Sequence, residues 1–104
     1  MKLEDAIKKI DDETKKYDLK NAQKDCADMV IEMATENEAI RDAIEKHSID
    51  ELLGAVLKKS FEIKTRVHDD IVKAAGLKPD KNQPVYDGSL SKAQIKKTIR
   101  EVYK

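Results

Sequence analysis

The stretch IDELLGAVLKKSFEIKTRVHDDIVKAA, residues 49–75, decides the fold because its side chains follow helical spacing with few breaks. The residues at this spacing are Leu52, Leu53, Val56, Leu57, Phe61, Lys64, Val67, His68, Ile71, Val72 and Ala75. They predict one helix about 40 Å long, against which every other helix can pack. Gly76 followed by Leu77 predicts a left-handed cap at its end, and Pro79 prevents continuation. Gly54 lies inside this helix and indicates a close helix crossing.

Four further helices are predicted around this central one. A helix over 3–17 carries a thin apolar stripe made of Leu3, Ile7, Ile10, Thr14 and Tyr17. A second helix over about 19–34 is expected to bury Ala22, Cys26, Met29, Val30 and Met33. Capping boxes that begin at Thr35, Ser48 and Ser91 predict a short helix over 36–46, the start of the long helix, and a last helix over 92–103. Residues 78–89, with two prolines, form the one real loop. We therefore expect an all-α, five-helix single domain over 1–104, built around the long helix at about 49–75.

Composition limits the class of protein. The 104 residues allow one core, 39% of them are hydrophobic and 40% charged, and tryptophan is absent, which is typical of a helical bundle. The apolar runs are too short to cross a bilayer. The acidic start lacks the apolar segment of a signal peptide, and a single cysteine fits a reducing compartment. We therefore expect the protein in the cytosol.

Charge is divided unequally along the chain. Residues 1–50 hold 9 basic and 14 acidic side chains, whereas residues 51–104 hold 12 basic and 7 acidic ones, so the halves carry −5 and +5. Between residues 25 and 51, nine acidic residues are opposed only by Arg41 and Lys46. Such an asymmetry indicates either a binding surface or two halves that face each other after folding.

Signatures of catalysis are weak. Glycines are too few for a phosphate loop, and Cys26 lies on an apolar helix face, as a small buried hydrophobe would. His47 with His68-Asp69 resembles the arrangement in metal-dependent helical phosphohydrolases, but no aspartate follows on a further helix. The two-motif carboxylate pattern of helical pyrophosphohydrolases is not matched either. We expect no catalytic residue, metal or cofactor, and a helical metal hydrolase remains only a third alternative.

Two charged faces are the candidate binding sites. Four acidic residues on the second helix step by three and four and therefore share one face. They are Asp25, Asp28, Glu32 and Glu36. Such a face can imitate nucleic-acid phosphates, although a merely solvated helix face is the alternative. The last helix carries a basic set, Lys92, Lys96, Lys97 and Arg100, which suits phosphates or simply the helix dipole.

Two stretches resemble a known family. Residues 26–53, CADMVIEMATENEAIRDAIEKHSIDELL, place an apolar helix, a polar break, a short helix and a capped helix in succession. Residues 90–103, LSKAQIKKTIREVY, form a capped closing helix that ends in an aromatic residue. Both are similar to the PcfK-like family of small phage and plasmid accessory proteins, some of which are anti-CRISPR inhibitors of the type II CRISPR effector nuclease. The resemblance carries over no functional residue.

The resemblance implies a location in the cytoplasm of a bacterial host cell. It also implies a protein partner, a CRISPR nuclease–guide RNA complex, whose DNA binding or cleavage would be blocked. Asp25, Asp28, Glu32 and Glu36 are the residues expected to bind it. The alternative is a small nucleic-acid-associated or plasmid-transfer protein that uses the basic last helix. The thin stripe of the first helix also permits a homodimer.

Overall fold

The computed structural model describes residues 1–63, 68–79 and 90–104, together with the backbone of 65–66 and 86–87. The described chain is helical and has one two-residue ladder. Its helices are α1 (Leu3–Lys16), α2 (Ala22–Glu36), α3 (Glu38–Lys46), α4 (Ile49–Ile63), α5 (Asp69–Ala74) and α6 (Lys92–Val102). Its strands are β1 (Thr65–Arg66) and β2 (Tyr86–Asp87). The all-α class is confirmed, with six helices in the described residues instead of five.

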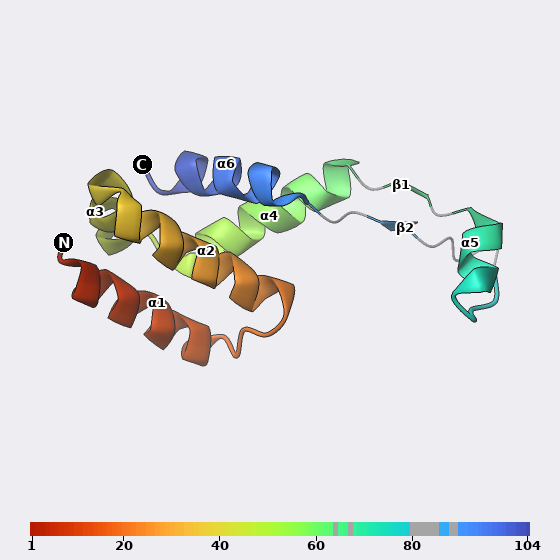
Figure 1. Cartoon of the computed structure of the whole chain (residues 1–104), viewed down its shortest axis with the longest axis horizontal. Helices are drawn as coiled ribbons and strands as arrows, with labels where there is room; N and C mark the ends of the chain where they lie inside the picture. The colour runs from red at the N-terminus through yellow and green to blue at the C-terminus, as the bar shows by residue number, and fades with distance from the viewer. Residues whose placement is uncertain (64, 67, 80–85, 88–89) are drawn as a thin grey trace.

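The molecule consists of a helical body and an arm (Figure 1). The body holds α1, α2, α3, α6 and the first part of α4, whereas α5 lies at the far end of the arm. Between them β1 pairs antiparallel with β2, with Thr65 opposite Asp87 and Arg66 opposite Tyr86. The principal extents of 51 × 23 × 19 Å reflect this elongated shape.

The core of the body is assembled from the apolar faces of α1, α2, α3, α4 and α6. Its largest fully buried side chains are Ile10, Val30, Ile44, Ile49, Leu52, Thr98 and Ile99. Within α1 the buried residues are Ala6, Ile10 and Glu13, so its inward face differs slightly from the stripe predicted from the sequence. Tyr17 is 41% exposed because α1 ends at Lys16 and the chain turns away. Val72 is buried apart from this core, on the arm.

The single long helix predicted over 49–75 is wrong, because α4 ends at Ile63 and α5 begins at Asp69. Every second residue from Ile63 to Val67 is β-branched, which favours extended backbone over helix. His68 then starts α5, because its Nδ1 accepts a hydrogen bond from the Asp70 amide at 3.1 Å. The side chains of Lys64 and Val67, which the prediction placed on the long helix, lie outside the described residues.

The structure shows which of the helix caps predicted from the sequence are formed. Ser91 and Gln94 form the predicted capping box of α6. Gly76, with φ of +83°, ends α5 as predicted, because its amide bonds to the Lys73 carbonyl and the Leu77 amide to the Val72 carbonyl. The box predicted at Thr35 is wrong: its hydroxyl bonds back to the Ile31 carbonyl, and Asn37 caps α3 instead.

At Ser48 half of the predicted box is present. The Glu51 carboxylate accepts a hydrogen bond from the Ser48 amide at 2.7 Å, while the Ser48 hydroxyl bonds to the Asp50 carboxylate. Within the segment predicted as a loop over 78–89, Tyr86 and Asp87 form β2, which pairs with β1. The rest of that loop, residues 80–85 and 88–89, lies outside the described residues.

Candidate functional site

The four carboxylates predicted to bind a partner all lie on the exposed face of α2. Asp25, Asp28, Glu32 and Glu36 are each solvent-exposed. The same helix buries Cys26, Ala27, Met29, Val30 and Ala34, whereas Ala22, predicted to be buried, is exposed and Met33 is half-buried. Because α2 packs against α1, α3, α4 and α6 through that apolar side, its acidic side faces outward. The structure therefore brings the four residues together as one stripe, called here the α2 acidic stripe.

Other acidic residues of the region have partners within the chain. The Asp42 carboxylate lies 2.6 Å from the N-terminal ammonium, which lowers the pKa of Asp42. The Glu51 carboxylate accepts a hydrogen bond from the Ser48 amide and lies 3.3 Å from His47, and these contacts lower the pKa of Glu51. No cation among the described residues pairs with the α2 acidic stripe. Asp42 and Glu51 are thus engaged within the chain, whereas the α2 acidic stripe faces solvent, as Glu38 and Glu45 also do.

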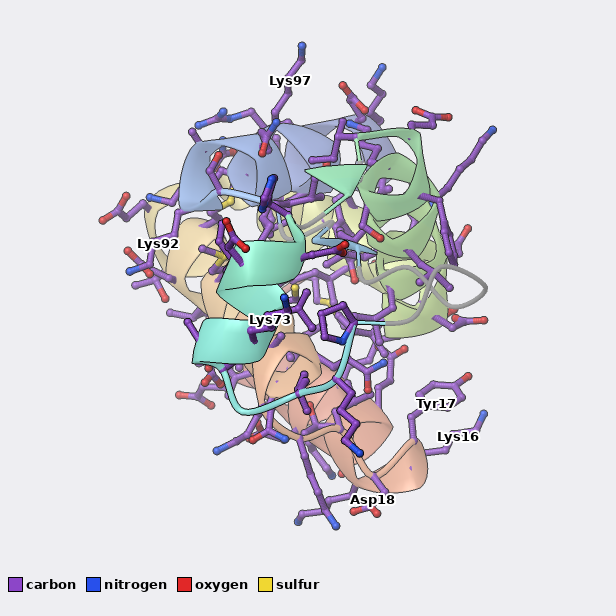
Figure 2. All side chains as sticks on the ribbon, turned by 90° about the vertical axis from the view of Figure 1, so that its right-hand side faces the viewer. Lys16, Tyr17, Asp18, Lys73, Lys92 and Lys97 are labelled. Atoms are coloured by element: carbon purple, nitrogen blue, oxygen red, sulfur yellow. The ribbon has the colours of Figure 1, made fainter. Side chains whose placement is uncertain are left out.

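The basic residues predicted as the alternative site lie on α6 but do not share one face equally. Lys92, Lys97 and Arg100 are exposed, whereas Lys96 is half-buried. Figure 2 shows Lys97 pointing away from the body and Lys92 projecting on another side. The neighbouring Glu101 is occupied by Lys59 of α4, whose ammonium lies 2.7 Å away and lowers the pKa of Glu101. The basic set is therefore more dispersed than the α2 acidic stripe.

A polar junction that the sequence did not reveal holds α1 against the turn between α3 and α4. The Lys9 ammonium donates to the carbonyls of Ile44 and His47, the latter at 2.8 Å, and so caps the end of α3. One turn later, the Glu13 carboxylate accepts a hydrogen bond from the Ile49 amide at 2.7 Å, at the start of α4. A cation thus meets the carboxyl end of one helix and an anion the amino end of the next, as helix dipoles favour.

The end of α6 closes over the same junction. The His47 ring meets the Tyr103 ring edge-on at 6.0 Å, and its Nε2 lies 3.3 Å from the Lys104 carbonyl. Burial, together with the negative charge of Glu13, raises the pKa of the Tyr103 phenol well above its usual range. Among the described residues, neither the Tyr103 hydroxyl nor the second oxygen of Glu13 has a hydrogen-bond partner. These contacts hold α1, the end of α6 and the turn between α3 and α4 together. Neither Lys9 nor Glu13 was predicted from the sequence as a site residue.

The metal-site patterns weighed from the sequence are not assembled. His47 follows α3 and His68 precedes α5, and these helices lie at opposite ends of the molecule (Figure 1). In the part of the chain that the structure describes, no three His, Cys, Asp or Glu side chains are grouped to hold a metal ion. Cys26 is buried in the core, and burial raises the pKa of its thiol.

Comparison of the chain with protein-family models, with curated proteins and with solved structures finds no match in any of the three. None of the helices in the described residues is both long enough and apolar enough to span a membrane.

Proposed function

We propose that this chain is a non-catalytic inhibitor that binds a type II CRISPR effector nuclease through the α2 acidic stripe and blocks DNA binding or cleavage. The observation that carries the proposal is the stripe itself: four exposed carboxylates, opposite the buried face of α2, with no cationic partner among the described residues. The resemblance of residues 26–53 and 90–103 to the PcfK-like family supports the identity of the partner.

The length of the stripe suits a groove that holds a nucleic-acid backbone. Asp25 and Glu36 are eleven residues apart, which is about 16 Å along a helix axis. One strand of duplex DNA places a phosphate about every 3.4 Å along its axis. The stripe therefore spans the length of about five phosphates and offers four negative charges over it. A basic groove shaped for a phosphate backbone would accept such a helix face.

The magnitude of these contacts shows what else binding requires. An exposed ion pair contributes about 0.2–1 kcal/mol, so four of them supply at most about 4 kcal/mol. A nanomolar complex needs about 12 kcal/mol. The stripe would therefore select the partner and its orientation, while apolar contacts elsewhere would supply most of the affinity.

The test is a DNA-cleavage assay with a purified type II CRISPR nuclease–guide RNA complex, titrated with this protein at low and at high salt. The proposal predicts saturable inhibition that weakens as salt screens the charges. Inhibition that is insensitive to salt would contradict the electrostatic mechanism. It would favour a mechanism in which a helix of this protein is wedged against a moving domain of the nuclease. Absence of inhibition with nucleases of several subtypes would refute the proposed partner.

The second candidate is a nucleic-acid-associated or plasmid-transfer protein that uses α6. It is favoured by the exposure of Lys92, Lys97 and Arg100 on that helix. A salt-sensitive shift of labelled DNA, lost when these three residues are changed to glutamine, would support it. The four exposed carboxylates of the α2 acidic stripe oppose it, because they repel phosphates.

A further inference from the structure

A second exposed surface lies on α4, on the side that faces away from the body. Leu57 is 57% exposed and Phe61, one turn later, is 60% exposed. Gly54, one turn before Leu57, is also exposed. These three residues follow each other at steps of three and four, so they form one stripe of α4, called here the α4 apolar stripe. It leads from the body toward the base of the arm (Figure 1).

Among the residues that the structure describes, nothing around Gly54 requires a glycine. A Cβ atom built at this position meets nothing within 4 Å, and the backbone there has ordinary helical geometry. Glycine is among the poorest helix formers, and no other helix of the described residues crosses closely at Gly54. The helix crossing predicted from the sequence at Gly54 is therefore not made within the described part of the chain. The position is open, so a side chain of another molecule could enter the notch that Gly54 leaves beside Leu57.

The charges around the stripe indicate which occupant fits. Asp50 lies on the same face, one turn before Gly54, and Glu51, Lys58 and Glu62 form a row along one side. All four are exposed, and together they carry a net charge of −2. A helix that docks here with apolar side chains on Leu57 and Phe61 would therefore be favoured if lysine or arginine flanked its apolar face.

A second copy of this chain fits the stripe poorly. Antiparallel self-pairing would place Phe61 of one copy over Gly54 of the other, which is sterically favourable. In such a pairing, however, equivalent side rows of the two helices face each other. Lys58 would then lie beside Lys58 of the second copy, and Glu51 beside Glu62 of the second copy. Like charges disfavour this arrangement, so the charge pattern selects a different protein over a homodimer.

We propose that the α4 apolar stripe is a docking site for a basic amphipathic helix of another protein, with Gly54 as the notch that receives a bulky side chain. The site is separate from the α2 acidic stripe, and it does not depend on the partner proposed for that stripe.

The test uses two labelled synthetic amphipathic helices of about 15 residues with the same leucine stripe, one flanked by lysine and the other by glutamate. Fluorescence anisotropy would measure their binding to the full-length protein. The proposal predicts that the lysine peptide binds at least about tenfold more tightly than the glutamate peptide. Changing Gly54→Gln or Leu57→Gln should each weaken binding of the lysine peptide by about tenfold or more.

The variants are chosen so that folding and binding can be separated. Glutamine favours helix more than glycine does, and the space around Gly54 is open, so Gly54→Gln should not lower the thermal midpoint. The control is a variant in which the α2 acidic stripe is neutralised. Adding Gly54→Gln to this variant should still weaken its binding of the lysine peptide. Equal binding of both peptides, or unchanged binding by Gly54→Gln, would overturn the proposal. A dimer detected by sedimentation and abolished by Gly54→Gln would also overturn it, because the stripe would then serve a second copy.

Discussion

Glu13 is the residue on which the contact between α1 and α4 most depends. It is 9% exposed, and its carboxylate accepts the hydrogen bond of the Ile49 amide, a fully buried residue. Replacing Glu13→Ala leaves that amide without an acceptor, and an unsatisfied buried donor costs about 1–3 kcal/mol. We expect the free energy of unfolding in urea to fall by this amount. Asp12→Ala, at the exposed neighbouring position, is the control and should change stability by less than about 0.5 kcal/mol.

Gly54 and Gly76 should respond in opposite directions to the same substitution. A methyl group at Gly54 meets nothing within 4 Å, so Gly54→Ala should raise the free energy of unfolding by about 0.5–1 kcal/mol through helix propensity. Gly76 has φ of +83°, a conformation that costs alanine about 1–2 kcal/mol, so Gly76→Ala should destabilise α5. Thermal unfolding followed by circular dichroism measures the first effect. Amide exchange within α5 measures the second, and equal effects of the two changes would contradict this assignment.

Residue patterns in the sequence predicted contacts that are local and missed those that are not. The Ser91 capping box and the Gly76 cap were predictable because both partners lie within a few residues. Lys9 and Glu13 belong to the charged side of a predicted helix, and nothing nearby in the sequence shows that they reach residues 44–49. Thr35 and Asn37 are both good N-caps, and the choice between them is decided by how α2 and α3 pack.

At the scale of elements, α4 and α6 are joined by a charge contact that should be lost in acid. Lys59 lowers the pKa of Glu101, and the Ser48 amide does the same for Glu51. A carboxylate whose pKa is lower when folded than its unfolded value of about 4.3 adds stability above that pH. The added stability disappears as the pH falls through the folded pKa. Stability should therefore decline between about pH 5 and pH 3.

The variant Glu101→Gln measures how much the contact between Lys59 and Glu101 contributes to that decline in stability. The variant lacks the titrating group, so its thermal midpoint should drop less than that of the native protein between pH 5 and pH 3. High salt should shrink the difference, because both side chains are partly exposed. Identical declines in the two proteins would show that the contact between Lys59 and Glu101 does not contribute to stability.

The main error of the sequence-based prediction also concerns the elements, because it placed one long helix over residues 49–75. Helical spacing continues through residues 49–75, but β-branched residues at alternate positions and the His68 cap interrupt the helix between Ile63 and Asp69. The paired residues are 22 positions apart for Thr65 and Asp87 and 20 for Arg66 and Tyr86, and such pairing leaves no local signal in so short a ladder. The α2 acidic stripe, by contrast, was predictable because helical spacing alone places its residues on one face.

At the scale of the whole molecule, the arm gives an elongated shape. The radius of gyration is 16.6 Å, whereas a compact chain of 104 residues has about 13 Å. Small-angle X-ray scattering should therefore give a value near 17 Å. A measured value near 13 Å would show that the arm folds back on the body in solution and covers part of α4.

The proposed function requires the α2 acidic stripe to bind a nuclease. The most direct measurement compares the affinities of two neutralised variants for an immobilised type II CRISPR nuclease–guide RNA complex. One variant carries Asp25→Asn, Asp28→Asn, Glu32→Gln and Glu36→Gln, and the other carries Glu4→Gln, Asp5→Asn, Asp11→Asn and Asp12→Asn. Both lose four exposed carboxylates, so their net charges are equal. We predict that the α2 variant loses at least about tenfold in affinity and the α1 variant much less, whereas equal losses would contradict a specific role for the stripe.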